Sequence, residues 1–137
     1  MTDTSDKTTI TSPHNEKLKL VRKLAQRKHR DREGLFVGEG EDLLEAARAA
    51  GREPVELLSA AGTGLGGTEV EPDLLASVSA LGSGTRAIGI WRIEYASAAQ
   101  LHRGSCVYLH GLSDPANVGA IVRSTRALVE GTVVLGP

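Results

Sequence analysis

The sequence predicts an α/β chain in two parts, a small α/β domain over residues 10–93 and a single strand–helix–strand unit over residues 106–137. Segments typical of strands alternate with segments typical of helices, which indicates α/β packing. The 137 residues suffice for one ordinary domain or for a small domain and part of another, and the pattern favours the second. Apolar residues make up 40% of the chain and aromatic residues 3%, so Leu, Val, Ile and Ala must build the core.

The first part begins with residues 1–9, which are polar and predict a disordered tail. A basic run with helical periodicity follows over residues 17–32. Beyond it, the patterns predict strands at residues 35–37, 54–59 and 86–93, helices at residues 41–50 and 72–81, a Gly-rich loop at residues 61–68 and a linker at residues 94–105. Trp91 is expected to anchor the core or an edge of the sheet.

The charges are segregated along a chain whose net charge is only −1. Eight of the 16 Lys and Arg residues lie within residues 17–32, whereas residues 33–81 hold ten acids and two cations. On a helical projection of this run, one face is apolar, and the other face carries the cations Lys19, Arg22, Lys23, Arg27 and Arg30. Such a stripe suits a phosphate backbone, and a solvated helix face is the alternative interpretation.

The second part centres on residues 114–128, which combine a turn, a helix start and an amphipathic helix. Pro115 ends the preceding strand because proline has no N–H for a ladder, and Asn117 fits the N-cap of the helix. The arc that would pack on a sheet consists of Val118, Ile121, Val122, Thr125 and Leu128. Arg123 lies outside this arc, among small residues. A strand at residues 132–137 completes a βαβ unit.

Two segments of the chain resemble one family of enzymes. The loop and helix residues Asp114, Pro115, Asn117, Gly119, Ile121 and Arg123, with the VVLGP strand that follows, resemble the first motif of the SpoU/TrmH branch of the SPOUT methyltransferases. Residues 10–15, 17–32 and 34–44 resemble the small substrate-binding domain that precedes the catalytic domain in those enzymes. Two further motifs, which in the family form a C-terminal knot that holds S-adenosylmethionine, are absent from this sequence.

The resemblance implies an RNA methyltransferase that transfers a methyl group from S-adenosylmethionine to a ribose 2′-hydroxyl, in rRNA in preference to tRNA, and that works as a homodimer in its complete form. Residues 10–93 would then form the RNA substrate-binding domain, with the five cations of the stripe as contacts. Residues 106–137 would form the start of the SPOUT (α/β knot) domain. Because the cofactor pocket belongs to the absent motifs, this chain is expected to bind S-adenosylmethionine poorly and to be catalytically incomplete.

The resemblance also assigns catalytic roles to Arg123 and Asn117. In the family, the arginine that matches Arg123 is assigned to activating the hydroxyl. A guanidinium stays protonated at ordinary pH, so we expect Arg123 to grip the adjacent phosphate and stabilise the alkoxide. Asn117 would shape the loop together with Gly119. A surface ion pair is the alternative for Arg123 and the favoured interpretation for Arg126.

The sequence gives no sign of several other kinds of site. The His residues lack ligand-like spacing, so no metal is expected. There is no 18-residue apolar run and no basic-then-apolar amino terminus, so we expect no membrane span, no signal peptide and a cytoplasmic protein. Cys106 lies in an apolar strand and is expected to be buried. Gly62, Gly64 and Gly67 satisfy G-x-G-x-x-G, but an acidic segment and Pro72 follow them, which favours a surface loop over a dinucleotide site.

Two questions stay open at this stage. Glu39, between two glycines, could lie near RNA, although a turn acid that helps to cap the following helix is the favoured interpretation. The chain itself could be the N-terminal portion of the methyltransferase or a non-catalytic RNA-binding module. The DNA downstream of the Pro137 codon would distinguish the two.

Overall fold

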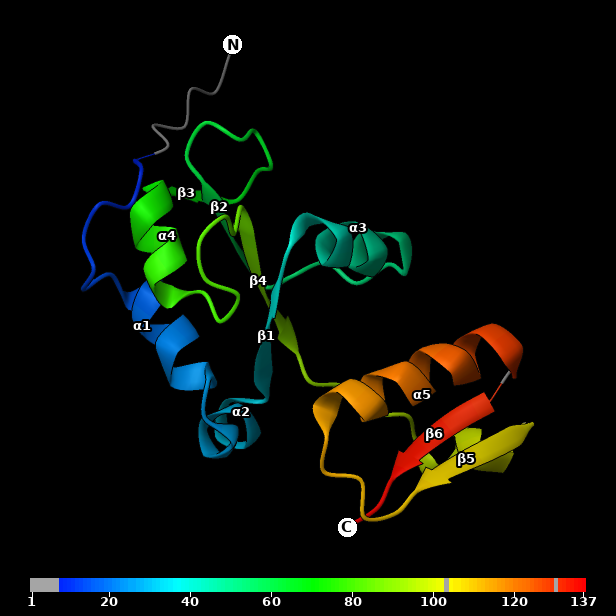
Figure 1. The fold of residues 1–137 in the computed structure, drawn as a ribbon. Helices are drawn as coiled ribbons and strands as arrows, with labels where there is room; N and C mark the ends of the chain where they lie inside the picture. The colour runs from blue at the N-terminus through cyan, green and yellow to red at the C-terminus, as the bar shows by residue number, and fades with distance from the viewer. Residues whose placement is uncertain (1–7, 103, 130) are drawn as a thin grey trace. The chain divides into compact units, whose positions relative to one another are not determined.

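The computed structural model describes residues 8–102, 104–129 and 131–137, and it divides the chain into two compact units, Met1–Ile93 (unit 1) and Glu94–Pro137 (unit 2). The predicted tail at residues 1–9 falls mostly on residues 1–7, which lie outside the described residues. The α/β class is confirmed, with a small α/β unit followed by one βαβ unit (Figure 1). No helix in the described ranges combines the length and apolarity that crossing a membrane would need.

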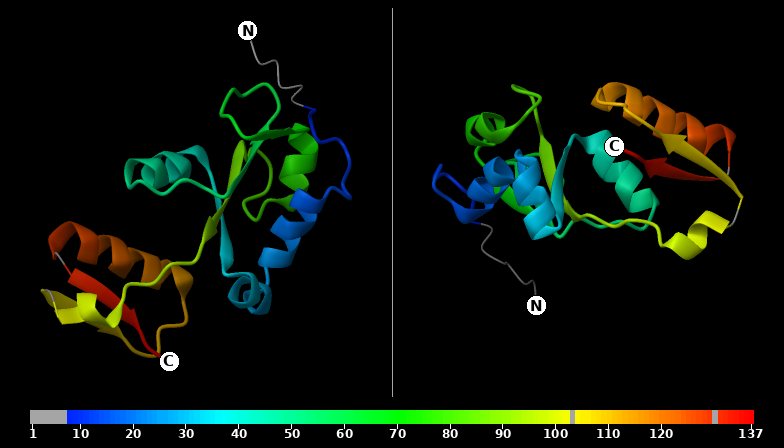
Figure 2. Two further views of the ribbon diagram at one scale, coloured as in Figure 1. Left: turned by 180° about the vertical axis from the view of Figure 1, so that it is seen from behind. Right: turned by 90° about the horizontal axis from the view of Figure 1, so that it is seen from below.

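Unit 1 is a four-stranded sheet covered by helices on both faces (Figures 1 and 2). The strand order is β1-β4-β2-β3, in which β4 is antiparallel to both its neighbours and β2 is parallel to β3. In chain order the elements are α1 (Glu16–Leu24), α2 (Arg27–Glu33), β1 (Leu35–Glu39), α3 (Glu41–Ala49), β2 (Glu56–Ala60), β3 (Thr68–Val70), α4 (Pro72–Val78) and β4 (Ala87–Arg92).

The core of unit 1 has one cluster on each face of the sheet. The larger cluster joins α1 and α4 to the sheet and is aliphatic, with Leu18, Leu58 and Ile88 fully buried. The smaller cluster packs α3 on the other face through Leu44 and Trp91. The indole of Trp91 lies against the glycines of the neighbouring strand positions, where a Cβ would collide with the ring, and its Nε1 donates to the carbonyl of Arg52 at 3.0 Å. The expected role of Trp91 as a core anchor is confirmed.

The basic run does not form one helix, contrary to the prediction. Helix α1 begins at its N-cap Asn15, whose side chain accepts from the N–H of Lys17, and it ends at Leu24. Gln26 is extended, with φ −92° and ψ 130°, and α2 starts one residue later. The Nη1 group of Arg30 donates to the carbonyls of Leu24 and Ala25, at 3.0 and 2.8 Å, and thereby satisfies acceptors that the break leaves free. The helical projection places Leu18 to Ala25 on one apolar face, and in the structure this face ends with α1 at Leu24.

Smaller differences concern the ends of elements. The strand expected at residues 54–59 corresponds to β2, which starts two residues later than expected. The helix expected at residues 72–81 corresponds to α4, which ends at Val78. Strand β3 was not predicted, and it extends the sheet beside β2, where Ile10 also joins through a bridge to Val70. Because a strand and not a helix follows Gly67, the loop reading of the glycine motif is confirmed. The expected linker contains a short 3₁₀ helix, Ala98–His102.

Unit 2 consists of the parallel strands β5 (Ser105–Leu109) and β6 (Gly131–Leu135), joined by α5 (Pro115–Leu128). This is the predicted βαβ unit. The helix begins at Asp114, whose side chain accepts from the N–H of Ala116 at 2.9 Å. The prediction of Asn117 as N-cap is wrong, because Asp114 followed by proline already caps the helix and places Asn117 in its first turn.

Much of the apolar surface of unit 2 is exposed. Thr125 is the buried residue of α5, while Val122 and Leu128 of the predicted packing arc are 42% and 83% exposed. Cys106 is exposed, so the expectation of a buried thiol is wrong. The physical reason is that β5 pairs only with β6 among the described residues, and a two-stranded sheet with one helix leaves side chains uncovered.

Candidate functional site

The five cations of the predicted stripe are distributed over α1 and α2, and four of them donate hydrogen bonds to groups of the chain itself. The Nζ groups of Lys19 and Lys23 each lie 2.6 Å from a carboxylate, of Glu16 and Glu33 respectively. Arg22 donates to the carbonyl of Pro13 at 2.8 Å. Arg30 is half-buried and binds the carbonyls that end α1. Arg27 has the loosest contact, 3.6 Å from Asp31, with its side chain 87% exposed.

Helix α2 carries further cations that the projection did not place on the stripe. Lys28 is exposed and has no ion-pair or hydrogen-bond partner among the described residues, and Arg32 lies 3.5 Å from Glu33. Between them, His29 accepts through Nδ1 from a guanidinium N–H of Arg32 at 3.2 Å, which requires the neutral ring. Partial desolvation and the positive charges of Arg32, Lys28 and Lys23 lower the pKa of His29 below its ordinary value. Desolvation is the larger cause of the lowered pKa, and the positive charges act in the same direction because both disfavour the protonated ring.

Glu33 completes this group of side chains at the end of α2. The hydrogen bond from Lys23, with the charges of Lys23 and Arg32, lowers the pKa of the Glu33 carboxyl. The pair Lys23–Glu33 joins α1 to α2, and Gly34, with φ 65°, ends α2 and leads directly into β1. The C-terminal end of α2 is therefore fixed by an ion pair to α1 and by the turn that leads into β1.

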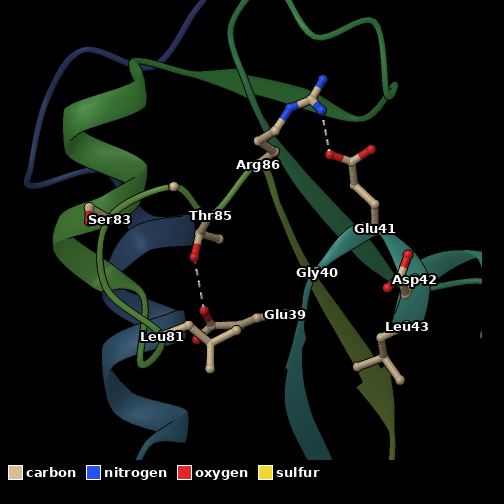
Figure 3. A pocket seen from close by; sticks show the side chains of 10 residues that line it. Glu39, Gly40, Glu41, Asp42, Leu43, Leu81, Ser83, Thr85 and Arg86 are labelled. Carbon is tan, nitrogen blue, oxygen red and sulfur yellow. Dashed lines mark hydrogen bonds and ion pairs between the residues drawn. The ribbon is translucent and has the colours of Figure 1, made fainter.

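A second feature is an open cavity of about 720 Å³ where β1 meets α3 (Figure 3). Glu39 does not cap α3, which corrects the favoured interpretation of this residue. Its carboxylate accepts from the hydroxyl of Ser79 at 2.5 Å and from the N–H of Ala80 at 2.7 Å, and in Figure 3 it points to Thr85. Gly40 is the N-cap of α3, and the Glu39 side chain points away from that helix. The carboxylate of Glu39 therefore fixes the loop between α4 and β4.

The charges at this cavity do not suit a phosphate. Glu41 and Asp42 line it, and the one arginine in its described lining, Arg86, lies 2.9 Å from the carboxylate of Glu41 (Figure 3). Carboxylates repel a phosphate backbone, and the guanidinium is already paired. No group of three His, Cys, Asp or Glu side chains anywhere in the described ranges is placed to hold a metal ion. The basic surface of α1 and α2 is the better candidate for a phosphate partner.

In unit 2 the structure brings the two predicted catalytic residues onto one helix. Asn117 lies in the first turn of α5 and is exposed, and Arg123 is exposed further along the helix. The guanidinium of Arg123 lies back over Gly119, where a Cβ would be 3.2 Å from its Nη1. Arg123 has no ion pair with any described residue. Its donors are therefore available to a ligand on the side of the loop that precedes the helix.

Comparison with known proteins connects these features. Residues 15–84 match the family described as the MRM3-like substrate binding domain. The chain belongs to the MRM3-like substrate binding domain family. The matched range spans α1 to the loop after α4, so it contains the whole basic surface and most of the cavity beside α3, whose lining residues Thr85 and Arg86 lie just beyond it. No curated protein sequence matches the chain.

Solved structures extend the likeness of this MRM3-like chain to unit 2. An RNA 2′-O ribose methyltransferase is 28% identical, with a TM-score of 0.66, over 94% of this chain and 55% of that one. An rRNA methyltransferase from Sinorhizobium meliloti with bound AdoMet is 26% identical, with a TM-score of 0.78, over 94% and 54%. The SpoU methyltransferase AviRb from Streptomyces viridochromogenes, 21% identical with a TM-score of 0.72 over 88% and 52%, shares the fold. The chain thus spans about half the length of these relatives.

Proposed function

We propose that this chain is the N-terminal portion of a cytoplasmic RNA methyltransferase that transfers a methyl group from S-adenosylmethionine to a ribose 2′-hydroxyl, with rRNA as its substrate. The observation that carries the proposal is the likeness to an RNA 2′-O ribose methyltransferase and to an rRNA methyltransferase, which extends over 94% of the chain and so includes both units. As in the resemblance from the sequence, the complete protein would act as a homodimer.

In this proposal unit 1 holds the RNA. The cations of α1 and α2 form the basic surface of a domain whose family is one of substrate binding. Phosphate contacts of this kind give affinity without sequence preference, and the affinity falls steeply as salt is added. The choice of nucleotide then depends on other contacts.

Arg123 is proposed to act on the reacting ribose. A 2′-hydroxyl is a weak nucleophile, and removing its proton creates an alkoxide whose charge must be stabilised while the reactants are held in line. A guanidinium presents two parallel N–H groups that match a phosphate, so Arg123 would hold the phosphate beside the ribose and stabilise the alkoxide. Gly119 leaves room for that side chain, and Asn117 shapes the first turn of the helix.

The cofactor would be held outside this sequence. When bound, S-adenosylmethionine supplies the electrophilic methyl group. In unit 2, apolar and aromatic side chains of the strands stay uncovered, with Tyr108 and Leu135 at 57% and 61% exposure, so a further part of the complete protein would have to cover them and form the cofactor pocket. Calorimetric titration of the 137-residue chain with S-adenosylmethionine should therefore give no micromolar dissociation constant.

The test uses a protein that carries this chain and the C-terminal half present in the relatives. Arg123→Ala should leave folding and cofactor affinity intact and remove most methyl transfer in single turnovers, since the lost contact is made mainly in the transition state. Arg123→Lys should also fail, because an ammonium lacks the planar two-pronged contact. Arg126→Ala is the control and should be mild. If Arg123→Ala retains more than about a tenth of the rate, a loss below about 1.4 kcal/mol, Arg123 is not catalytic.

The second candidate is an RNA-binding module without catalysis. It is favoured by one observation, that the matched family is a substrate binding domain and ends within unit 1. RNA binding by the 137-residue chain, together with no methyl transfer by any longer product of the same gene, would support this candidate over the enzyme.

A further inference from the structure

The hydrophobic packing of unit 1 does not explain the presence of helix α2. Of the four α-helices described in unit 1, α2 alone contributes no buried residue, whereas α1, α3 and α4 each insert at least one leucine into a core cluster. Its seven residues, RKHRDRE, comprise four cations, a histidine and two acids. Arg30 and Glu33 attach the helix to α1, His29 is half-buried, and the remaining side chains face solvent. A surface helix with this composition presents charge to a ligand.

Two of these cations are available to a ligand without breaking a close contact. Lys28 has no partner among the described residues, and Arg27 reaches Asp31 only at 3.6 Å. Lys28 and Arg32 are four residues apart, so two like charges stand on one side of the helix and raise the positive potential there, although Glu33 lies 3.5 Å from Arg32. The lowered pKa of His29 between them is consistent with that positive potential. The complementary ligand is polyanionic.

An apolar pocket of about 360 Å³ opens beside α2. It lies between α1, the middle of α2, β1 and the segment after α4, and its lining includes Val21, Leu24, Arg30, Glu39, Val78 and Ala80. The carboxylate of Glu39 is held there by the hydroxyl of Ser79 and the N–H of Ala80. Arg30 is thus shared by the helix and the pocket. Only its Nη1 is used in contacts with described residues, so further N–H groups remain for a ligand. Phe36 also contributes to the described lining, but its ring stacks on Trp91, with the ring centroids 6.0 Å apart, on the face of the sheet that α3 covers.

We propose that α2 and this pocket form a site for an unpaired nucleotide of the RNA substrate, with its phosphates on Arg27 and Lys28 and its base in the pocket beside Arg30. The proposal rests on the proposed function in one respect, that unit 1 binds RNA. Single-stranded RNA fits because its bases can be splayed out and placed against apolar and guanidinium groups. A duplex fits poorly because its bases are stacked and its grooves do not present them to an apolar pocket.

The first experiment tests the phosphate contacts on the 137-residue chain. Affinity for an unstructured single-stranded oligoribonucleotide is measured across a range of salt concentrations for Arg27→Gln/Lys28→Gln and for the charge-matched control Arg48→Gln/Arg52→Gln at the end of α3. Each phosphate contact on a single strand contributes about 0.7 to the slope of log affinity against log salt, so the α2 variant should lose about 1.4 and the control close to none. Equal losses in the two variants would overturn the assignment to α2.

The second experiment tests the pocket. Ala80→Phe fills it, and the control Ala50→Phe adds the same ring at an exposed position that follows α3. Ala80→Phe should weaken binding of the single strand at least tenfold and leave the weaker binding of the matching duplex unchanged, while Ala50→Phe should affect neither. Equal affinity for single strand and duplex, or an unaltered single-strand affinity in folded Ala80→Phe, would refute the base pocket.

These outcomes separate the inference from the proposed function. If the chain binds RNA but α2 and pocket variants behave as their controls do, RNA binding stands and this site is wrong. If neither the chain nor a longer protein that contains it binds RNA, the proposed function fails and the site fails with it. The fluorescence of Trp91, the only tryptophan and buried in unit 1, reports whether each variant is folded.

Discussion

Replacing Arg30 should destabilise unit 1, although this residue was predicted as an RNA contact. Its guanidinium donates to the carbonyls of Leu24 and Ala25, one partly buried and one exposed. A hydrogen bond to a charged group contributes about 1.5–3 kcal/mol when buried, and an exposed one much less, so Arg30→Ala should cost about 2 kcal/mol. For a domain of this size that loss lowers the melting temperature by roughly 8–16 °C. Arg30→Lys should lose more than half of the stabilisation, because the ammonium of the shorter lysine side chain does not reach the position of Nη1, which donates both hydrogen bonds.

The measurement is thermal and urea unfolding followed by the fluorescence of Trp91, which isolates unit 1 because no other tryptophan exists in the chain. Arg27→Ala is the control, since its exposed 3.6 Å ion pair should be worth less than about 0.5 kcal/mol. If Arg30→Ala and Arg27→Ala unfold at the same temperature, the guanidinium does not stabilise the end of α1. Arg30 would then be an ordinary surface cation, as the projection of the sequence treated it.

Two further predictions follow from the structure. The pKa of His29 is lowered from 6.5, so the unfolded chain binds the proton more readily, and the stability of the folded chain should fall as the pH drops below 6.5. An NMR titration should place this pKa below that of a free histidine. Arg32→Gln should raise the pKa of His29, and an unchanged pKa in that variant would count against the coupling between the two side chains. Cys106 is exposed, so a thiol reagent should modify the native chain about as fast as the urea-unfolded chain, whereas strong protection would mean that another surface covers β5.

Glycines, prolines and hydrophobic period were enough to predict most of the fold. Gly34 and Gly51 mark where helices end, Pro72 and Pro115 mark where helices begin, and the apolar run of β4 occupies the buried centre of the sheet. These signals are local, because each depends on the backbone angles or the missing N–H of one residue. The succession of most strands and helices along the chain could therefore be predicted without knowledge of the contacts between them.

The features that were missed depend on contacts between distant residues. The break at Gln26 has no glycine or proline to mark it, and it is stabilised by the side chain of Arg30. Strand β3 has three residues and exists because β2 lies beside it. Glu39 could not be assigned from sequence, because Ser79 and Ala80 are 40 and 41 residues away. The start of α5 is different, since Asp114 before Pro115 is a local signal that could have been preferred over Asn117.

For the candidate site, the sequence predicted the sign of the charge but not which cations are available. Lys19 and Lys23 lie in ion pairs at the surface, and such pairs contribute about 0–1 kcal/mol, so a phosphate can replace the carboxylate at little cost. Arg30 differs because moving it away would leave the partly buried carbonyl of Leu24 without a donor, which costs about 1–3 kcal/mol. An RNA strand should therefore engage Lys28 and Arg27 first and recruit the lysines of α1 next. Arg30 keeps its contacts to α1, and only its remaining N–H groups can meet a base.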